Sequence, residues 1–137
     1  MIPVVRHFIV CEDMLRHPDN PNKVTLVNLI STIRPLDDAG FPLCVPQLCV
    51  FAQATECRGT GILHLRIEQS DSGEEVFRSS DWVQTFSNRP LDVVGIPFRI
   101  LDCTFPTPGV YDVELWYGAD RIAQQPIRVE EFHHVDE

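Results

Sequence analysis

Residues that end helices and form turns interrupt this chain at short intervals. The 137 residues include 11 prolines and seven glycines, and the runs between them are rich in valine, isoleucine, threonine and aromatic residues. Proline breaks a helix because it lacks an N–H group and its ring clashes with the preceding turn. Short β-branched runs with a turn signal about every 8–14 residues are typical of a sandwich or barrel of strands. We therefore expect an all-β fold without a long helix.

These runs predict about seven to nine strands. The clearest lies at residues 62–69, where Leu63, Leu65 and Ile67 alternate with polar residues. Pro97 lies on the polar face of its own run, which predicts an edge strand or a bulge. The predicted strands cover residues 3–10, 23–33, 47–56, 62–69, 75–79, 91–103, 111–117 and 121–131.

The segments between the strands are predicted to be loops. Residues 11–23 hold two prolines, so Asp13–Arg16 has room for one turn of helix at most. Residues 34–46 hold three prolines, and residues 80–90 have no clear pattern. The fold class that follows is an antiparallel β-sandwich, immunoglobulin-like with Greek-key connections, in a single domain over residues 1–137.

The charge of the chain argues against two classes of partner. It has 20 acidic and 11 basic residues, a formal net charge of −9, and one lysine, Lys23. Nucleic acids and anionic membranes draw proteins mainly through Lys and Arg, so neither is expected as a partner. The N-terminus has no signal-peptide pattern and no run is long and apolar enough to span a bilayer, which predicts a cytoplasmic protein.

The cysteines fit the same compartment. Their number is odd, no C-x-x-C occurs, and their spacing matches no zinc site. We expect all five to be reduced and mostly buried as small apolar side chains. They are Cys11, Cys44, Cys49, Cys57 and Cys103.

The segment Phe105-Pro-Thr-Pro-Gly-Val-Tyr111 is the most specific motif in the chain. Its members Pro106 and Pro108 stiffen the approach to a strand, and Gly109 permits a turn conformation that other residues avoid. A tyrosine opening a strand in this way resembles the corner tyrosine of immunoglobulin-like domains, whose hydroxyl bonds back to the preceding backbone. Val113 stands where antibody domains have a cysteine, so the disulfide between the sheets is absent.

The same motif, with two others, resembles a small bacterial family of unknown function. The other two are Cys11-Glu12 and Pro21-Asn22-Lys23, which leads into the second predicted strand. These motifs are structural, so the resemblance supports the fold and implies no chemistry.

No catalytic or metal-binding pattern can be recognised, and no cofactor is expected. The chain has neither a G-x-S-x-G motif nor a phosphate-binding glycine loop. Its histidines are dispersed: His64 is predicted to be solvated, and the adjacent His133 and His134 point apart on an extended chain. Acidic residues cluster at Asp37-Asp38 and at Asp71–Glu75, so calcium or small-ligand binding by these loops remains an alternative function.

An outward-facing tryptophan is the better functional lead. If Tyr111 faces the core, strand alternation places Asp112, Glu114 and Trp116 on the outer face. Tryptophan is enriched at the centres of protein interfaces, and Trp82 is a second interface candidate. The competing interpretation is that residues 80–90, with Trp82 and Phe86, fold over Trp116 and bury it.

The sequence thus predicts a non-enzymatic binding or assembly module that contacts a protein partner or a second copy of itself. The alternative is the calcium- or ligand-binding sandwich, and an enzyme ranks third.

Overall fold

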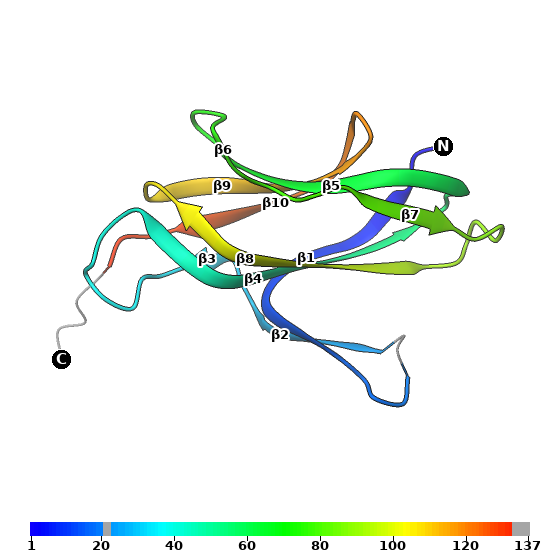
Figure 1. Ribbon diagram of the computed structural model, residues 1–137, viewed down its shortest axis with the longest axis horizontal. Coiled ribbons are helices and arrows are strands. Elements are labelled where there is room, and N and C mark those ends of the chain that lie inside the picture. Colours follow the sequence, from blue (N-terminus) through cyan, green and yellow to red (C-terminus); the bar gives the residue numbers. More distant parts are fainter. Residues whose placement is uncertain (21–22, 133–137) are drawn as a thin grey trace.

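The computed structural model describes residues 1–20 and 23–132, and these residues form two facing β-sheets (Figure 1). The first sheet has four strands and is called sheet A. The strands of sheet A, from one edge to the other, are β2 (Val24–Leu29), β1 (Val4–Arg16), β4 (Leu43–Thr55) and β8 (Val94–Phe105).

The second sheet, called sheet B, has six strands. Their order is β3 (Thr32–Ile33), β10 (Asp120–Val129), β9 (Gly109–Tyr117), β5 (Gly59–Gln69) and β6 (Glu75–Arg78), with β7 (Trp82–Phe86) also paired to β5. All pairs are antiparallel except β3 with β10. The all-β sandwich is therefore confirmed, with ten strands over the described residues in place of the predicted seven to nine.

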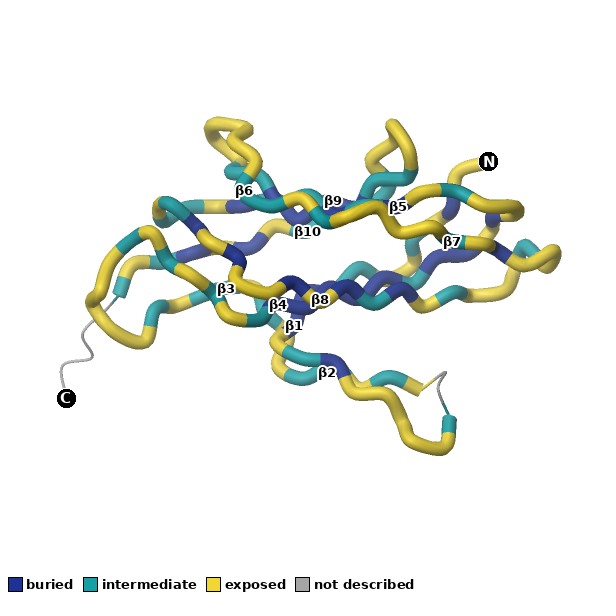
Figure 2. The backbone as a smooth tube through the Cα atoms, viewed as in Figure 1, coloured by how far each residue is buried: buried dark blue, intermediate teal, exposed yellow. Residues whose placement is uncertain are grey.

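The core lies between the facing sides of the two sheets (Figure 2). Alternate residues of β5 point into it, and Leu63, Leu65 and Ile67 are fully buried, as the sequence predicts. Burying one such side chain stabilises the fold by about 1.5–3 kcal/mol. β8 lies at the edge of sheet A, which confirms the position predicted from Pro97.

Tyr111 is fully buried at the start of β9. Its hydroxyl donates a hydrogen bond to the carbonyl oxygen of Thr107 at 2.6 Å, and its ring packs edge-on against Phe105 with centroids 4.9 Å apart. Gly109, the first residue of β9, has a φ of 146°, a conformation that favours glycine. This is the arrangement expected of a corner tyrosine.

The first predicted loop is wrong. Residues 11–16 continue β1, which pairs with β4 as far as Cys11 and with β2 from Cys11 to Arg16. Asp13–Arg16 is strand and not helix, because its partner at residues 24–29 supplies the backbone hydrogen bonds. The end of β1 and all of β2 form a hairpin, called the arm, that bends away from the rest of sheet A (Figure 1).

Three other boundaries also differ from the prediction. Residues 23–33 form two strands in different sheets, because β2 pairs with β1 and β3 pairs with β10. β4 begins inside the predicted loop at 34–46, and the unplaced stretch 80–90 contains β7. Each of these segments finds its strand partner far away in the sequence, where local pattern gives no signal.

Candidate functional site

Trp116, the leading interface candidate, lies on the outer face of sheet B and is half-buried. Its ring stacks on His64 of the neighbouring strand, with centroids 6.2 Å apart and planes within 8°. Its indole N–H donates to Oε1 of Glu114 at 3.2 Å. Burial, followed by the charge of Arg78, lowers the pKa of His64, so the stacked imidazole is neutral at pH 7.

Glu114 is not the exposed residue that the alternation predicts, because only 1% of it is accessible. β9 lies between β5 and β10, so long side chains on both neighbours cover its outer face. The Glu114 carboxylate accepts a hydrogen bond from Arg121 at 3.1 Å in addition to that from Trp116. A buried carboxylate held in this way stabilises the sheet and offers little surface to a partner.

The rest of this outer face is also paired within the chain. Arg66 forms ion pairs with Glu68 at 2.8 Å and with Glu75 at 3.1 Å. Burial and the neighbouring Glu114 carboxyl raise the pKa of Glu68. Asp112 accepts a hydrogen bond from the Ser70 hydroxyl at 2.9 Å.

Trp82 lies in a different place from Trp116. Trp82 belongs to β7, at the edge of sheet B, and its side chain lies on the opposite face of that sheet from Trp116. Its ring packs against Phe98 of β8, with centroids 5.8 Å apart. Phe86, in the same strand, is buried in the core against Tyr117. The interpretation that residues 80–90 cover Trp116 is therefore wrong; its own sheet neighbours do so.

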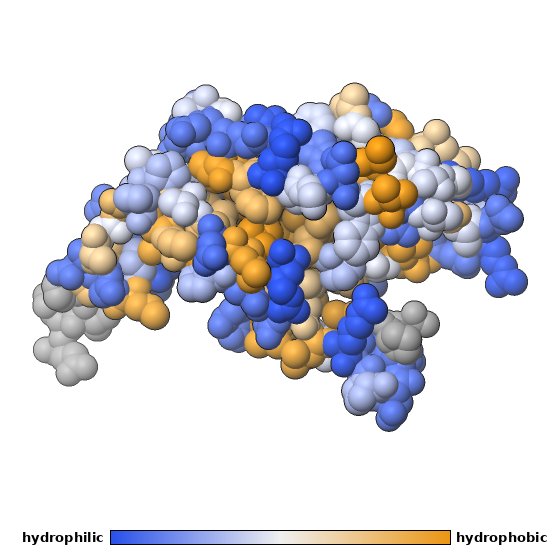
Figure 3. Space-filling model, in the orientation of Figure 1, coloured by the Kyte–Doolittle hydropathy of each residue, from blue (hydrophilic) through white to orange (hydrophobic). Residues whose placement is uncertain are grey.

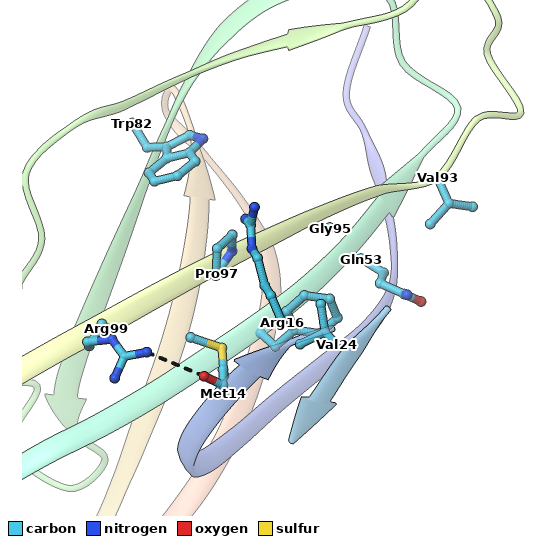
Figure 4. A pocket seen from close by; sticks show the side chains of 10 residues that line it. Met14, Arg16, Val24, Gln53, Trp82, Val93, Gly95, Pro97 and Arg99 are labelled. Carbon is cyan, nitrogen blue, oxygen red and sulfur yellow. Dashed lines mark hydrogen bonds between the residues drawn. The ribbon is translucent and has the colours of Figure 1, made fainter. Parts of the chain in front are cut away.

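Trp82 borders a cleft of about 770 Å³ on the outer side of sheet A (Figure 4). The arm forms one wall, β4 and β8 form the floor, and the space-filling view shows the arm tip standing off the body (Figure 3). A volume of several hundred Å³ is typical of sites that bind small molecules. The lining residues are Met14, Arg16, Val24, Phe51, Gln53, Trp82, Val93, Gly95, Pro97 and Arg99.

The floor of the cleft is apolar. Phe51 projects outward from β4, and its Cα partner on β8 is Pro97. A Cβ atom on Gly95 would lie 3.1 Å from Cζ of Phe51, so the missing side chain at this position leaves room for the ring. On the arm side, Phe51 packs in a small cluster with Met14 and others; the remaining members are Cys11, Cys49, Val24 and Leu26.

Polar contacts hold the arm over sheet A. Nη1 of Arg99 donates to Oδ1 of Asp13 at 3.0 Å. Nη2 of the same side chain donates to the carbonyl oxygen of Met14 at 3.5 Å, the contact drawn in Figure 4. Gln47 of β4 donates to the same Asp13 oxygen at 3.2 Å. The backbone N–H of Met14 and the Arg99 guanidinium lower the pKa of Asp13, so its carboxylate stays charged at neutral pH.

Arg16 differs from Arg99 in having no ion pair within the described part of the chain. It sits exposed at the end of β1, and its side chain extends from the arm toward β8 in Figure 4. The described lining residues include two arginines and no acidic residue, in a chain whose net charge is −9. The cleft is thus a positive, partly apolar site on an acidic protein.

The acidic loops do not come together. Among residues 1–20 and 23–132, no group of three or more His, Cys, Asp or Glu side chains could hold a metal ion. Asp37 instead caps its own loop through the N–H of Ala39, at 3.0 Å. The tail pair His133-His134 lies outside the described residues.

All five cysteines are free thiols. Four are buried as predicted, whereas Cys44 is exposed near the start of β4, which corrects the expectation for that residue. Cys11 and Cys49 face each other across β1 and β4. Burial, together with the neighbouring Cys49 thiol, raises the pKa of Cys11 to about 11.

The sequence interpretation missed the cleft, although one signal could have shown it. In the strand at 47–56, Val50 and Ala52 point to the core while Cys49 and Phe51 point the other way. A strand that is apolar on both faces is covered on both faces. That pattern implies a second layer over sheet A, which the arm supplies.

Comparison with known proteins places the chain in a family. It belongs to a family of unknown function (DUF6941), whose model matches residues 6–130. This confirms the predicted resemblance to an uncharacterised family. None of the curated proteins compared with the chain matches it. No helix in the described residues is long and apolar enough to cross a membrane.

Proposed function

We propose that this chain is a non-enzymatic binding module that holds a protein partner in the cleft between the arm and sheet A. The observation that carries the proposal is the cleft itself, a hollow of about 770 Å³ with an apolar floor. Its Arg16 has no ion pair among the residues that the structure describes. The outer face of sheet B, which the sequence favours, has its charged groups paired within the chain. The cleft, and not the outer face of sheet B, therefore offers groups that can bind a partner.

The polar groups of the lining favour binding over catalysis. They are the guanidinium groups of Arg16 and Arg99 and the amide of Gln53, with the Trp82 indole at the border. A guanidinium remains protonated in proteins, and an amide is neither a base nor a nucleophile at neutral pH. These groups orient and neutralise a ligand, which is what recognition requires.

The strand order supports an immunoglobulin-like sandwich. β1, β4 and β8 neighbour one another in sheet A, and β10, β9 and β5 do so in sheet B. This matches the A-B-E and G-F-C groups of immunoglobulin domains, and the Tyr111 corner at the start of β9 matches strand F. Free thiols at Cys11 and Cys49, on paired strands, support the cytoplasm as the compartment.

In-cell photo-cross-linking tests the proposal even though the partner is unidentified. A photoreactive phenylalanine analogue replaces Val93, which is 48% exposed at the end of the cleft. The matched control carries it at Val83, which is 67% exposed on β7 of sheet B and does not line the cleft.

We expect adducts of one reproducible mass from the Val93 position and none of that mass from Val83. An adduct at twice the mass of the chain would identify a second copy as the partner. The same adducts from both positions, or adducts from Val83 alone, would contradict binding at the cleft.

A further inference from the structure

The shape of the cleft suits an extended chain. Four lining residues, Val93, Gly95, Pro97 and Arg99, alternate along one strand or directly before it. From the first to the last, six residue-to-residue steps of extended backbone cover about 20 Å at roughly 3.3 Å per step. The floor is therefore as long as an extended peptide of about seven residues.

The apolar lining repeats along that length. Val93 stands at one end, Phe51 and Pro97 lie in the middle, and Trp82 borders the side away from the arm. Alternate side chains of an extended peptide point the same way, about 6.6 Å apart. Such a peptide can direct every second side chain into the floor, and apolar residues fit there best.

The charge of the cleft determines which residues fit at the other positions of a bound peptide. Arg99 is committed to Asp13, but Arg16 has no ion pair within the described residues. Among residues 1–20 and 23–132, no acidic side chain lines the cleft to compete for Arg16. A carboxylate on the bound segment would complete a charge-assisted hydrogen bond with this guanidinium.

We propose, resting on the proposed function, that the cleft binds an extended segment of another protein in which acidic residues alternate with apolar ones. The carboxylate pairs with Arg16, and the apolar side chains lie over Phe51 and Pro97. A different protein fits better than a second copy, because two chains of net charge −9 repel each other as they approach.

Selection from a displayed library of random heptapeptides tests the ligand class. The bait is the full chain, and the enriched peptides are synthesised for affinity measurement. Each is measured against the native chain, Arg16→Gln and the control Arg128→Gln, which removes one exposed positive charge from β10 of sheet B. Both variants therefore change the net charge equally.

The expected result is a consensus with Asp or Glu between apolar residues, with affinity about tenfold weaker in Arg16→Gln and unchanged in Arg128→Gln. A neutral or basic consensus, no enrichment, or equal losses in both variants would overturn the acidic class. If Val93 still cross-links a partner in cells, the binding module stands and only the ligand class fails. If Val93 captures nothing, the proposed function fails as well.

Discussion

The outer faces of the two sheets carry similar side chains and have opposite properties. Each presents a tryptophan or phenylalanine beside arginines, around Trp116 on sheet B and Phe51 on sheet A. On sheet B, Trp116 and Arg121 both donate hydrogen bonds to Glu114, which is 1% exposed. On sheet A, the tip of the arm stands off the body (Figure 3), and Arg16 has no ion pair within the described residues.

The difference shows that an outward-facing aromatic residue does not by itself make a binding site. A central strand with long side chains on both sides buries its own outer face. The cleft forms where the arm lies over β8, whose outer surface carries the small or compact residues Gly95 and Pro97. Substitutions on the two faces should therefore have different effects on stability and on binding.

The largest effect is expected for Glu114→Ala. It removes a buried carboxylate that accepts hydrogen bonds from Arg121 and Trp116. It also leaves a void between β5 and β10. We expect a loss of about 2–3 kcal/mol in the free energy of unfolding. Chemical denaturation measures it, with Gln53→Ala on the cleft floor as the control that changes stability by less than about 0.5 kcal/mol. Equal losses of stability at both sites would contradict the claim that the paired groups on sheet B stabilise the fold more than the cleft floor does.

Trp116→Ala follows in size. The substitution removes a half-buried ring stacked on His64, which should cost about 2 kcal/mol of stability. Because the ring is covered by its own sheet, the capture of partners by the Val93 cross-linker should not change. A variant with native stability and lost capture would return the binding site to sheet B.

Tyr111→Phe tests the tyrosine corner in the core between the two sheets. It removes the hydroxyl that bonds to Thr107 and keeps the ring against Phe105, so the expected loss is on the order of 1 kcal/mol. Denaturation midpoints of the native chain and the variant give the value. An unchanged midpoint would show that the corner contributes nothing to stability.

The smallest effect on global stability is expected for Asp13→Asn. The substitution weakens the contact with Arg99 that holds the arm, so hydrogen exchange in β2 should accelerate while exchange in β5 stays unchanged. The pKa of Asp13 is lowered in the folded chain, so its contribution is complete above the ordinary pKa of aspartate and is lost as the pH falls through the lowered value. At neutral pH the native arm should therefore stay protected; equal exchange in both chains would argue against this contact.

The fold could be predicted where a strand's own residues carry the pattern. Alternation over 62–69 identifies β5, and Pro97 identifies an edge strand. The Tyr111 hydroxyl lies where its motif places it. In each case the signal is within a dozen residues of the feature that it predicts.

The candidate site could be predicted only in part, because its parts are distant in the sequence. The sequence singles out Trp82, but the place of this residue in the cleft depends on β8 and the arm. Asp13 is 86 positions from Arg99, and residues 11–16 become a strand only when 24–29 pair with them. The burial of Glu114 likewise depends on side chains from two other strands.

The two tryptophans of the chain provide the most direct test of the central claim, because one borders the cleft and the other lies on sheet B. Trp116→Phe leaves Trp82 as the sole indole fluorophore, and Trp82→Phe leaves Trp116. Each variant is titrated with the peptide that the library selects. Binding in the cleft predicts a saturable emission change from Trp82 and a flat signal from Trp116. A saturable change from Trp116 with a flat signal from Trp82 would contradict the account.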